Sequence, residues 1–317
     1  SPDNCVGCGL CAAECPGKGG NKALEMVNVH EMMGEAKLAD YLFNETEYKK
    51  ELVNDTPKGT QFLKPYFEVP GSCPGCGEAP YYRLVSQLFG PDMLVANATG
   101  CSSIYCGSTP LTPFVEDKDG NGVAWANSLF EDNAEYGFGM RIATDYKLMA
   151  ISSIVKEALG TDLDAKLKAD LENYLANIKN REVTRKLVPD LILEIEASKN
   201  ETVKKLKPYY RDMIDKSVWI VGGDGWGYDI GYGGLDHVIA SEEDVNILLL
   251  DTEVYSNTGG QSSKSSQTGS IAKFTASGKT TAKKNLALIA MSYGNVYVAQ
   301  ISLGANPIAA IKAMKEA

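Results

Sequence analysis

Four short apolar runs mark the carboxyl-terminal half of the chain, at 218–221, 245–250, 286–291 and 296–301. Runs of this length, bounded by polar residues or glycine, are typical of strands that are buried on both faces. Residues 236–240, between the first two runs, have helical spacing. Strands that alternate with helices indicate βαβ units, so we predict an α/β fold with a largely parallel sheet flanked by helices.

Helical patterns surround these runs. Residues 82–89 have helical spacing, residues 93–96 form a short apolar run that predicts a strand, and residues 307–316 resemble a closing helix. Between 153 and 216 the chain is rich in Lys, Glu, Asp and Leu, with apolar residues every three or four positions. This segment is predicted to be a helical excursion that covers the sheet.

Length and turn residues divide the chain. At 317 residues, a prior of about 150 residues per domain suggests two domains. Residues 1–50 hold a cysteine-rich loop and a charged, helix-like stretch, which is too little for an independent core. Pro57, Gly59, Pro65, Pro70 and Gly71 indicate an extended connector. We therefore predict a partial domain over 1–50, a connector over 51–72, and an α/β domain over 73–317.

The composition favours a globular, cytoplasmic protein. Hydrophobic residues make up 44% of the chain, yet no apolar run approaches the roughly twenty residues of a membrane span. The amino terminus lacks the basic and then apolar pattern of a secretory signal. The net charge of -10 disfavours nucleic acid or an acidic membrane surface as a partner. We expect neither kind of partner.

The eight cysteines cluster, which favours metal binding in a reducing compartment over a secreted disulfide scaffold. The two histidines, His30 and His237, lie far from any cysteine pair. The chain therefore offers almost no residues for a Cys–His zinc site or for a nucleophile activated by histidine. His237 is expected to have an ordinary surface or core role.

Cys5, Cys8, Cys11 and Cys15, with Pro16, have the spacing of a bacterial ferredoxin run. Such a run places three thiolates on one 4Fe-4S cluster, and its fourth cysteine ligates the other cluster of a two-cluster ferredoxin. The partner run is absent from these 317 residues, so we expect half of a ferredoxin-like domain that is cut at its amino terminus. A zinc knuckle or stray reduced thiols are the alternative.

A second group of cysteines follows the connector. Cys73 and Cys76 flank a Pro-Gly turn that suits two thiolates aimed at one metal, and Cys101 and Cys106 lie downstream. Spacing alone leaves three possibilities open: four-sulfur zinc, a redox dithiol, or an iron-sulfur cluster. On the sequence alone Cys106 is the obvious fourth ligand.

A diphosphate motif spans the two best-defined strand predictions. Gly223-Asp224-Gly225 is followed by 26 residues and then by Thr252-Glu253-Val254-Tyr255-Ser256-Asn257. Asp224 and Thr252 both follow predicted strands, and open α/β sheets bind ligands at the carboxyl ends of their strands. The Asp224 carboxylate, the Thr252 hydroxyl and the Val254 carbonyl would give magnesium three hard oxygens. The spacing predicts a thiamine diphosphate enzyme.

Together these motifs resemble the carboxyl-terminal part of the pyruvate:ferredoxin oxidoreductases over nearly the whole chain. The resemblance rests on Cys-Pro-Gly-Cys-Gly-Glu from Cys73, Asn-Ala-Thr-Gly-Cys-Ser-Ser-Ile-Tyr from Asn97, Trp-Ala-Asn-Ser-Leu-Phe-Glu-Asp-Asn-Ala-Glu from Trp125, and the two diphosphate segments. It implies a thiamine diphosphate-binding fold that uses Mg2+ and 4Fe-4S clusters. The implied reaction converts pyruvate and coenzyme A to acetyl-CoA and carbon dioxide, with electrons passed to ferredoxin or flavodoxin by an enzyme that is typically a homodimer.

The resemblance also implies residue roles. Cys73, Cys76 and Cys101 would ligate the cluster nearest the thiamine, while Glu78 and Cys101 would contact the cofactor. The diphosphate and magnesium would be held by Asp224, Gly225, Trp226, Gly227, Thr252, Glu253, Val254, Tyr255, Ser256 and Asn257. Asn257 would also act in turnover, because its amide would lie where charge changes during the reaction. The plain alternative is that Asn257 only shapes a turn.

Three features depart from the family pattern. Its fourth ligand to that cluster would lie beyond Ala317, so the α/β domain is expected to be truncated at its carboxyl terminus. Cys106 stands where glycine is expected, and Ala79 where threonine is expected. The glutamate that activates the thiamine belongs to an amino-terminal domain in the family, so this chain alone is expected to be inactive.

Two alternatives remain open from the sequence. A related oxidoreductase could act on 2-oxoglutarate, branched 2-oxoacids or indolepyruvate. From another class, an iron-sulfur electron-transfer module or a zinc-stabilised module would carry no thiamine chemistry.

Overall fold

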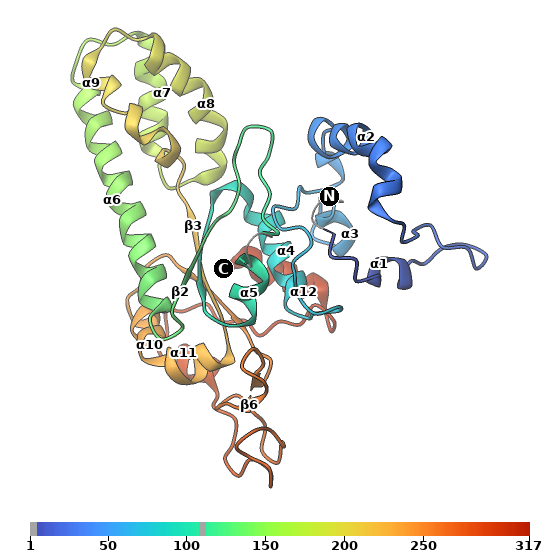
Figure 1. Cartoon of the computed structure of the whole chain (residues 1–317). Helices are drawn as coiled ribbons and strands as arrows, with labels where there is room; N and C mark the ends of the chain where they lie inside the picture. Colours follow the sequence, from blue (N-terminus) through green and yellow to red (C-terminus); the bar gives the residue numbers. More distant parts are fainter. Residues whose placement is uncertain (1–4, 108–111) are drawn as a thin grey trace.

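A four-stranded parallel sheet forms the centre of the protein, which a computed structural model describes over residues 5–107 and 112–317. In spatial order the strands are β2 (Ala124–Ser128), β1 (Met93–Ala98), β3 (Ser217–Gly223) and β4 (Asn246–Leu250). All three strand pairs are parallel (Figure 1). The predicted parallel sheet is therefore confirmed, and three of its strands correspond to the predicted runs 93–96, 218–221 and 245–250, with β4 beginning one residue later than predicted.

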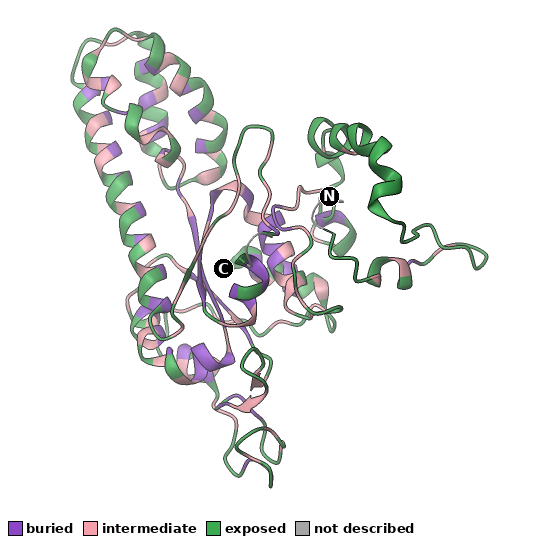
Figure 2. Cartoon of the chain, in the orientation of Figure 1, coloured by how far each residue is buried: buried purple, intermediate pink, exposed green. Residues whose placement is uncertain are grey.

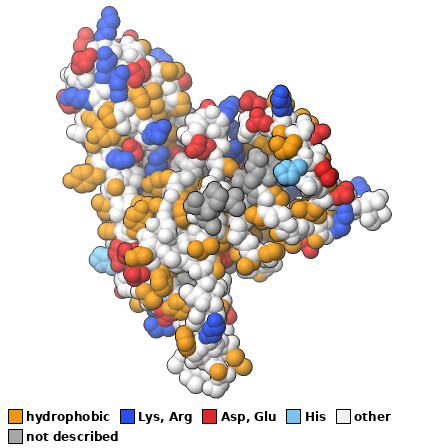
Figure 3. Space-filling view, in the orientation of Figure 1, with side chains coloured by type: hydrophobic (Ala, Val, Ile, Leu, Met, Phe, Trp, Pro, Cys, Tyr) orange, Lys and Arg blue, Asp and Glu red, His pale blue; other side chains and the backbone are white. Residues whose placement is uncertain are grey.

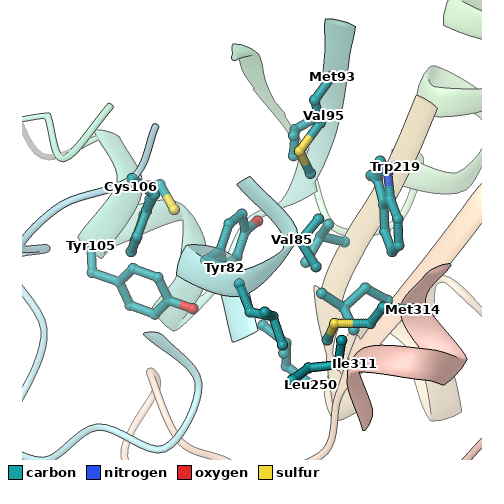
Figure 4. Packing of buried hydrophobic residues seen from close by; sticks show 14 residues of the cluster. Tyr82, Val85, Met93, Val95, Tyr105, Cys106, Trp219, Leu250, Ile311 and Met314 are labelled. Carbon is teal, nitrogen blue, oxygen red and sulfur yellow. The ribbon is translucent and has the colours of Figure 1, made fainter. Parts of the chain in front are cut away.

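Helices cover both faces of this sheet. On one face α4 (Ala79–Phe89), α5 (Cys101–Gly107) and α12 (Pro307–Glu316) supply a core with side chains such as Tyr82, Val95, Trp219, Ile311 and Met314 (Figure 4). On the other face α6 (Asn133–Leu159) and α10 (Tyr232–Ala240) pack against the alternate strand residues, among them Ala98 and Ile220. Alternation of side chains along β3 accounts for the two separate cores.

The helical excursion is a separate layer with its own core. The long helix α6 runs from the sheet to the far end, where α7 (Ala165–Ala176), α8 (Arg181–Ala197) and α9 (Glu201–Lys204) pack against it (Figure 1). The core of the excursion is formed by buried residues that include Ile151, Val155, Leu171, Tyr174 and Leu191. Asp164, Asn180 and Asn200 cap the three shorter helices through their side chains. The helices predicted over 153–216 are present, although the first begins at Asn133. The prediction that this excursion covers the sheet is wrong, because the core that its helices share contains no strand residue.

Charged side chains of both signs cover the far end of the excursion (Figure 3). Exposed ion pairs such as Lys166–Glu194 and Lys207–Glu196 lie on these helices. Among the residues that the structure describes, no helix is both long enough and apolar enough to cross a bilayer.

The strands predicted at 286–291 and 296–301 are wrong. Residues Leu286–Met291 form helix α11, whose first turn is capped because the Asn285 side chain accepts a hydrogen bond from the Leu288 amide at 2.9 Å. Its Leu, Ala and Met residues also have high helix propensity. Residues 296–301 have no ladder partner in the described part of the chain, where β4 pairs only with β3. Apolar runs of this length do not by themselves separate strand from helix.

The amino-terminal segment consists of loops and short helices, with consecutive helical stretches over 29–45 where a helix-like stretch was predicted, and it is almost entirely exposed (Figure 2). Cys15 is its single buried residue between positions 5 and 52. Downstream, the predicted extended connector contains the short helix α3 (Pro57–Thr60), and Phe67 is fully buried in the core beneath α4. Residues 51–52 belong to a 3-10 helix and a turn follows α3 at 61–62, so the connector is extended only in part.

The remaining elements are short. They are α1 (Leu10–Ala13), η2 (Val29–Glu35), α2 (Ala36–Asp40), η3 (Tyr41–Glu45), η4 (Lys50–Leu52), η5 (Gly90–Asp92), η6 (Lys207–Asp212), η7 (Gly225–Ile230), β5 (Val254–Tyr255) and β6 (Gln261–Ser262). Strands β5 and β6 form an antiparallel pair in the loop after β4.

A buried ion pair fastens α6 to the start of β3. The Arg141 guanidinium is fully buried, donates to Asp215 at 2.9 Å and donates to the Lys216 carbonyl at 3.0 Å. Arg141→Leu would leave the buried Asp215 without its partner, so the free energy of unfolding in urea should fall by about 3–5 kcal/mol.

Lys147→Met, which removes a partly exposed pair with Asp212, is the matched control and should cost less than about 1 kcal/mol. A loss for Arg141→Leu that is no larger than the control's would contradict this role.

Candidate functional site

The carboxyl ends of three adjacent strands meet at one edge of the sheet. In the register of β3 and β4, Gly223 is paired with Leu250, so Asp224 and Asp251 leave the sheet side by side. The Thr252 hydroxyl lies 3.4 Å from Asp224 Oδ1 and 3.1 Å from the Val254 carbonyl oxygen. The structure thus brings the three predicted magnesium oxygens together.

Asp224 is the unusual member of this group. Its side chain is buried at 3% exposure, and its Oδ2 has no hydrogen-bond partner. Burial raises the pKa of the Asp224 carboxyl, and the nearby Asp251 adds to that rise. A buried carboxylate oxygen without a partner is costly, and a cation would satisfy it.

The donor set suits magnesium better than zinc. It combines one carboxylate with two uncharged oxygens, and magnesium completes its octahedron with waters and phosphate oxygens. In the described part of the chain, three or more His, Cys, Asp or Glu side chains nowhere gather into a metal site. A cation held by these three oxygens would keep coordination positions for waters or for the oxygens of a diphosphate.

Close packing explains the glycines around Asp224. A Cβ on Gly225 would lie 2.4 Å from the Tyr255 ring, and one on Gly227 would lie 2.5 Å from Leu249. The Trp226 side chain is buried at 1% exposure and packs beside Gly222 and Gly231. Only the backbone of 225–227 can therefore face a ligand at this turn.

The second half of the motif lies on the surface of the long loop, residues 251–285. Ser256 and Asn257 are exposed, and the Ser256 hydroxyl lies 2.7 Å from the Thr252 hydroxyl. Glu253 has a positive φ of 66°, which is uncommon for a residue with a side chain. The hydroxyls and backbone groups of 252–257 thus surround the same edge as Asp224.

Cys101 joins this edge from the neighbouring strand β1, because helix α5 begins three residues after Ala98. Burial raises the pKa of the Cys101 thiol to about 11, with smaller contributions from the negative forms of Glu78, Cys76, Cys73 and Asp224. These groups therefore share one electrostatic neighbourhood.

Glu78 immediately precedes α4, and its side chain is half-buried. Its Oε2 accepts a hydrogen bond from the Tyr105 hydroxyl at 3.1 Å. Burial raises the pKa of Glu78 and Asp224 raises it further, while the bond from Tyr105 lowers it. Tyr105 is a contact that the sequence motif contains but to which the sequence assigns no role.

Cys106 lies elsewhere. Its side chain is fully buried among Tyr82, Val85 and the other residues of the α4 core (Figure 4). Burial raises the pKa of this thiol well above its ordinary value. Its position in the apolar core disfavours the fourth-ligand role that its sequence position suggested.

The four amino-terminal cysteines do not converge on one point. Cys5, Cys8 and Cys11 are exposed, and α1 carries Cys11. Cys15 is buried and accepts a hydrogen bond from the Ala23 amide at 3.2 Å. Backbone amides, first that of Gly17, lower the pKa of the Cys15 thiol.

Sequence comparison adds independent findings. Residues 204–317 match the family model for the C-terminal TPP-binding domain of thiamine pyrophosphate enzymes. The chain is 48% identical over 326 residues to the pyruvate:ferredoxin oxidoreductase of Moorella thermoacetica, covering 100% of this chain and 28% of that protein. It is 48% identical to the pyruvate-flavodoxin oxidoreductase of Klebsiella pneumoniae, covering 100% of this chain and 27% of that protein. The chain therefore spans little more than a quarter of the length of these relatives.

Among solved structures, a 2-oxoglutarate:ferredoxin oxidoreductase from Magnetococcus marinus aligns with a TM-score of 0.47 at 21% identity. The alignment covers 81% of this chain and 63% of that one.

The burial of Asp224 gives a prediction about the metal-free protein. Because folding raises the pKa of the Asp224 carboxyl, its ionised form destabilises the fold at neutral pH. This destabilisation disappears once the pH falls below the pKa of an aspartate in the unfolded chain, about 4. Asp224→Asn should therefore raise the free energy of unfolding at neutral pH, measured in urea with a chelator present.

The gain should shrink as the pH approaches about 4. Asp236→Asn, which alters a half-buried carboxylate on α10, should give no such gain. Equal stability of Asp224→Asn and the unsubstituted protein at neutral pH would show that the burial carries no cost.

Proposed function

We propose that the chain belongs to the family of pyruvate:ferredoxin and pyruvate-flavodoxin oxidoreductases, and that it supplies the part of such an enzyme that binds thiamine diphosphate. The enzyme would decarboxylate pyruvate oxidatively, form acetyl-CoA from coenzyme A, and reduce ferredoxin or flavodoxin. We further propose that the enzyme is a cytoplasmic homodimer. In this chain, residues 1–50 would form a partial ferredoxin-like domain, 51–72 a connector, and 73–317 the α/β domain that binds thiamine diphosphate.

One observation carries the cofactor assignment. The unpartnered Asp224 Oδ2, the Thr252 hydroxyl and the Val254 carbonyl lie together at the carboxyl end of β3 and β4. They would hold Mg2+, while the backbone of 225–227 and the groups of 252–257 would hold the diphosphate. Magnesium bound there would supply the missing positive charge beside a buried carboxylate.

When bound, thiamine diphosphate would act as the electron sink for decarboxylation. The chain's own residues would fix its position and exclude alternative orientations. Exposed Asn257 would direct its side-chain amide at the reacting end, and half-buried Glu78 would contact the cofactor next to Cys101. Asn257 is thus the proposed catalytic residue.

Cys73, Cys76 and Cys101 would ligate a 4Fe-4S cluster close to the thiamine site. The support is that Cys76 and Cys101 pack against the same core beneath α4, and that a tight turn, in which the Cys76 amide donates to the Cys73 carbonyl at 3.0 Å, keeps Cys73 beside Cys76. Cys5, Cys8, Cys11 and Cys15 would ligate further 4Fe-4S iron. When bound, such clusters would carry single electrons toward the protein acceptor.

The magnesium assignment is tested by cofactor retention. Asp224→Asn removes the anionic ligand, so the Mg2+ concentration needed for half-maximal thiamine diphosphate binding should rise by at least about tenfold, as expected for a lost charged contact. Equilibrium dialysis of the protein against Mg2+ and thiamine diphosphate measures this.

Asp236→Asn is the control and should bind as the unsubstituted protein does. Unchanged Mg2+ dependence in Asp224→Asn would refute the assignment.

The cluster assignment is tested by iron analysis after anaerobic reconstitution. Cys101→Ser should lose about four iron atoms and their acid-labile sulfide per chain, the content of one 4Fe-4S cluster. Cys106→Ala should keep them, because Cys106 lies in the apolar core. Equal iron in both variants, or zinc in place of iron, would favour a different metal site.

A further inference from the structure

Glu253 separates the two candidate magnesium ligands Thr252 and Val254, and its backbone is strained. Its φ of 66° is one of three positive values among the described residues that are not glycine. Such a conformation persists only where the surrounding contacts over-determine it, and it commonly marks a functional site. The turn at Glu253 aims the Val254 carbonyl back at the Thr252 hydroxyl, 3.1 Å away.

Hydrogen bonds hold the Glu253 amide, its carbonyl and one of its two carboxylate oxygens. Its amide donates to Asp251 Oδ1 at 3.0 Å, and its carbonyl accepts a hydrogen bond from the Ser266 hydroxyl. Its Oε1 accepts hydrogen bonds from Gln267 at 2.8 Å and from Lys283 at 3.2 Å. Three of these partners come from the far side of the long loop, which therefore folds back onto the turn.

Lys283 is the strongest of these contacts because it joins two carboxylates. Its ammonium lies 2.7 Å from Asp251 Oδ2 and 3.2 Å from Glu253 Oε1. Asp251 and Glu253 flank Thr252 in the chain, so one cation holds both neighbours of the candidate ligand. Tyr228 donates to the same Asp251 oxygen at 3.0 Å and ties the group to η7.

We propose that Lys283 is a positioning residue for the diphosphate site, which holds Glu253 in its strained conformation and thereby keeps Thr252 and Val254 aimed at Asp224. This inference rests on the proposed thiamine diphosphate function and extends it to a residue outside both motif segments. The role includes charge compensation. Without Lys283, the carboxylates of Asp251 and Glu253 would face an incoming diphosphate uncompensated, and like charges in a partly buried site repel strongly.

The experiment compares four variants of the protein with the unsubstituted one. Lys283→Met removes the cation, Lys283→Arg restores a charge of different shape, and Lys264→Met removes a cation of the same loop that pairs with Asp229. The double variant Glu253→Gly with Lys283→Met supplies a residue that adopts positive φ without strain. Two readouts are used: half-saturating Mg2+ for thiamine diphosphate binding by dialysis, and amide hydrogen exchange of residues 252–256 without cofactor.

Lys283→Met should raise the half-saturating Mg2+ by about tenfold and speed exchange in 252–256, because two charged contacts are lost. Lys283→Arg should recover most of the binding, and Lys264→Met should stay within about twofold of the unsubstituted protein, a surface-pair effect. The Glu253→Gly double variant should bind better than Lys283→Met alone.

Unchanged exchange in Lys283→Met, or a double variant that binds no better than Lys283→Met, would overturn the positioning role. If the unsubstituted protein binds no thiamine diphosphate, the proposed function fails. The exchange comparison then still decides whether Lys283 orders the turn, because it is made without cofactor.

Discussion

The parallel register of β1, β3 and β4 is the constraint on which the candidate site depends. Pairing of Asn97 with Val221 and of Gly223 with Leu250 ends three strands at one edge. The chain then leaves each strand with a different chemical group: Cys101 after β1, Asp224 after β3, and Thr252 after β4. Hydrogen bonds of the sheet therefore bring a thiol, a carboxylate and a hydroxyl together from positions far apart in the sequence.

The site also concentrates negative charge in a partly buried place. Asp224 is buried without a partner for one oxygen, while Lys283 compensates Asp251 and Glu253. This division suits the proposed cofactor, because one oxygen of Asp224 remains free for a cation while Lys283 offsets one of the two negative charges on Asp251 and Glu253. Strain at Glu253 fits the same scheme, since functional sites are where backbone strain is tolerated. The buried Asp224 carboxylate lowers the stability of the fold, whereas the hydrogen bonds and ion pairs of the surrounding loop increase it.

The sequence predicted the structure correctly where short apolar runs mark strands and where a functional motif follows them. The strands before Asp224 and Thr252 follow from short apolar runs, and the motif spacing predicted that Asp224, Thr252 and Val254 would meet. The short apolar run at 286–291 could not by itself distinguish a helix from a strand. There the Asn285 side chain caps a helix. β2, with the mixed sequence Ala-Trp-Ala-Asn-Ser, gave no strand signal because its burial is only partial.

Contacts between distant segments were beyond sequence reasoning. Cys106 lies five residues from Cys101, and only the path of α5 shows that its thiol enters the core. Lys283 lies 30 residues from Glu253, and no spacing rule connects a lysine of the Lys283-Lys284 pair to a strained turn.

The most direct measurement of the central claim is the position of a bound cation. Mn2+ can replace Mg2+ in crystals grown with thiamine diphosphate, and its anomalous scattering locates it independently of the protein atoms. The account predicts one Mn2+ peak within about 2.5 Å of Asp224 Oδ2, the Thr252 hydroxyl and the Val254 carbonyl, with diphosphate oxygens completing its shell. A diphosphate bound elsewhere, or a peak that does not touch Asp224, would contradict it.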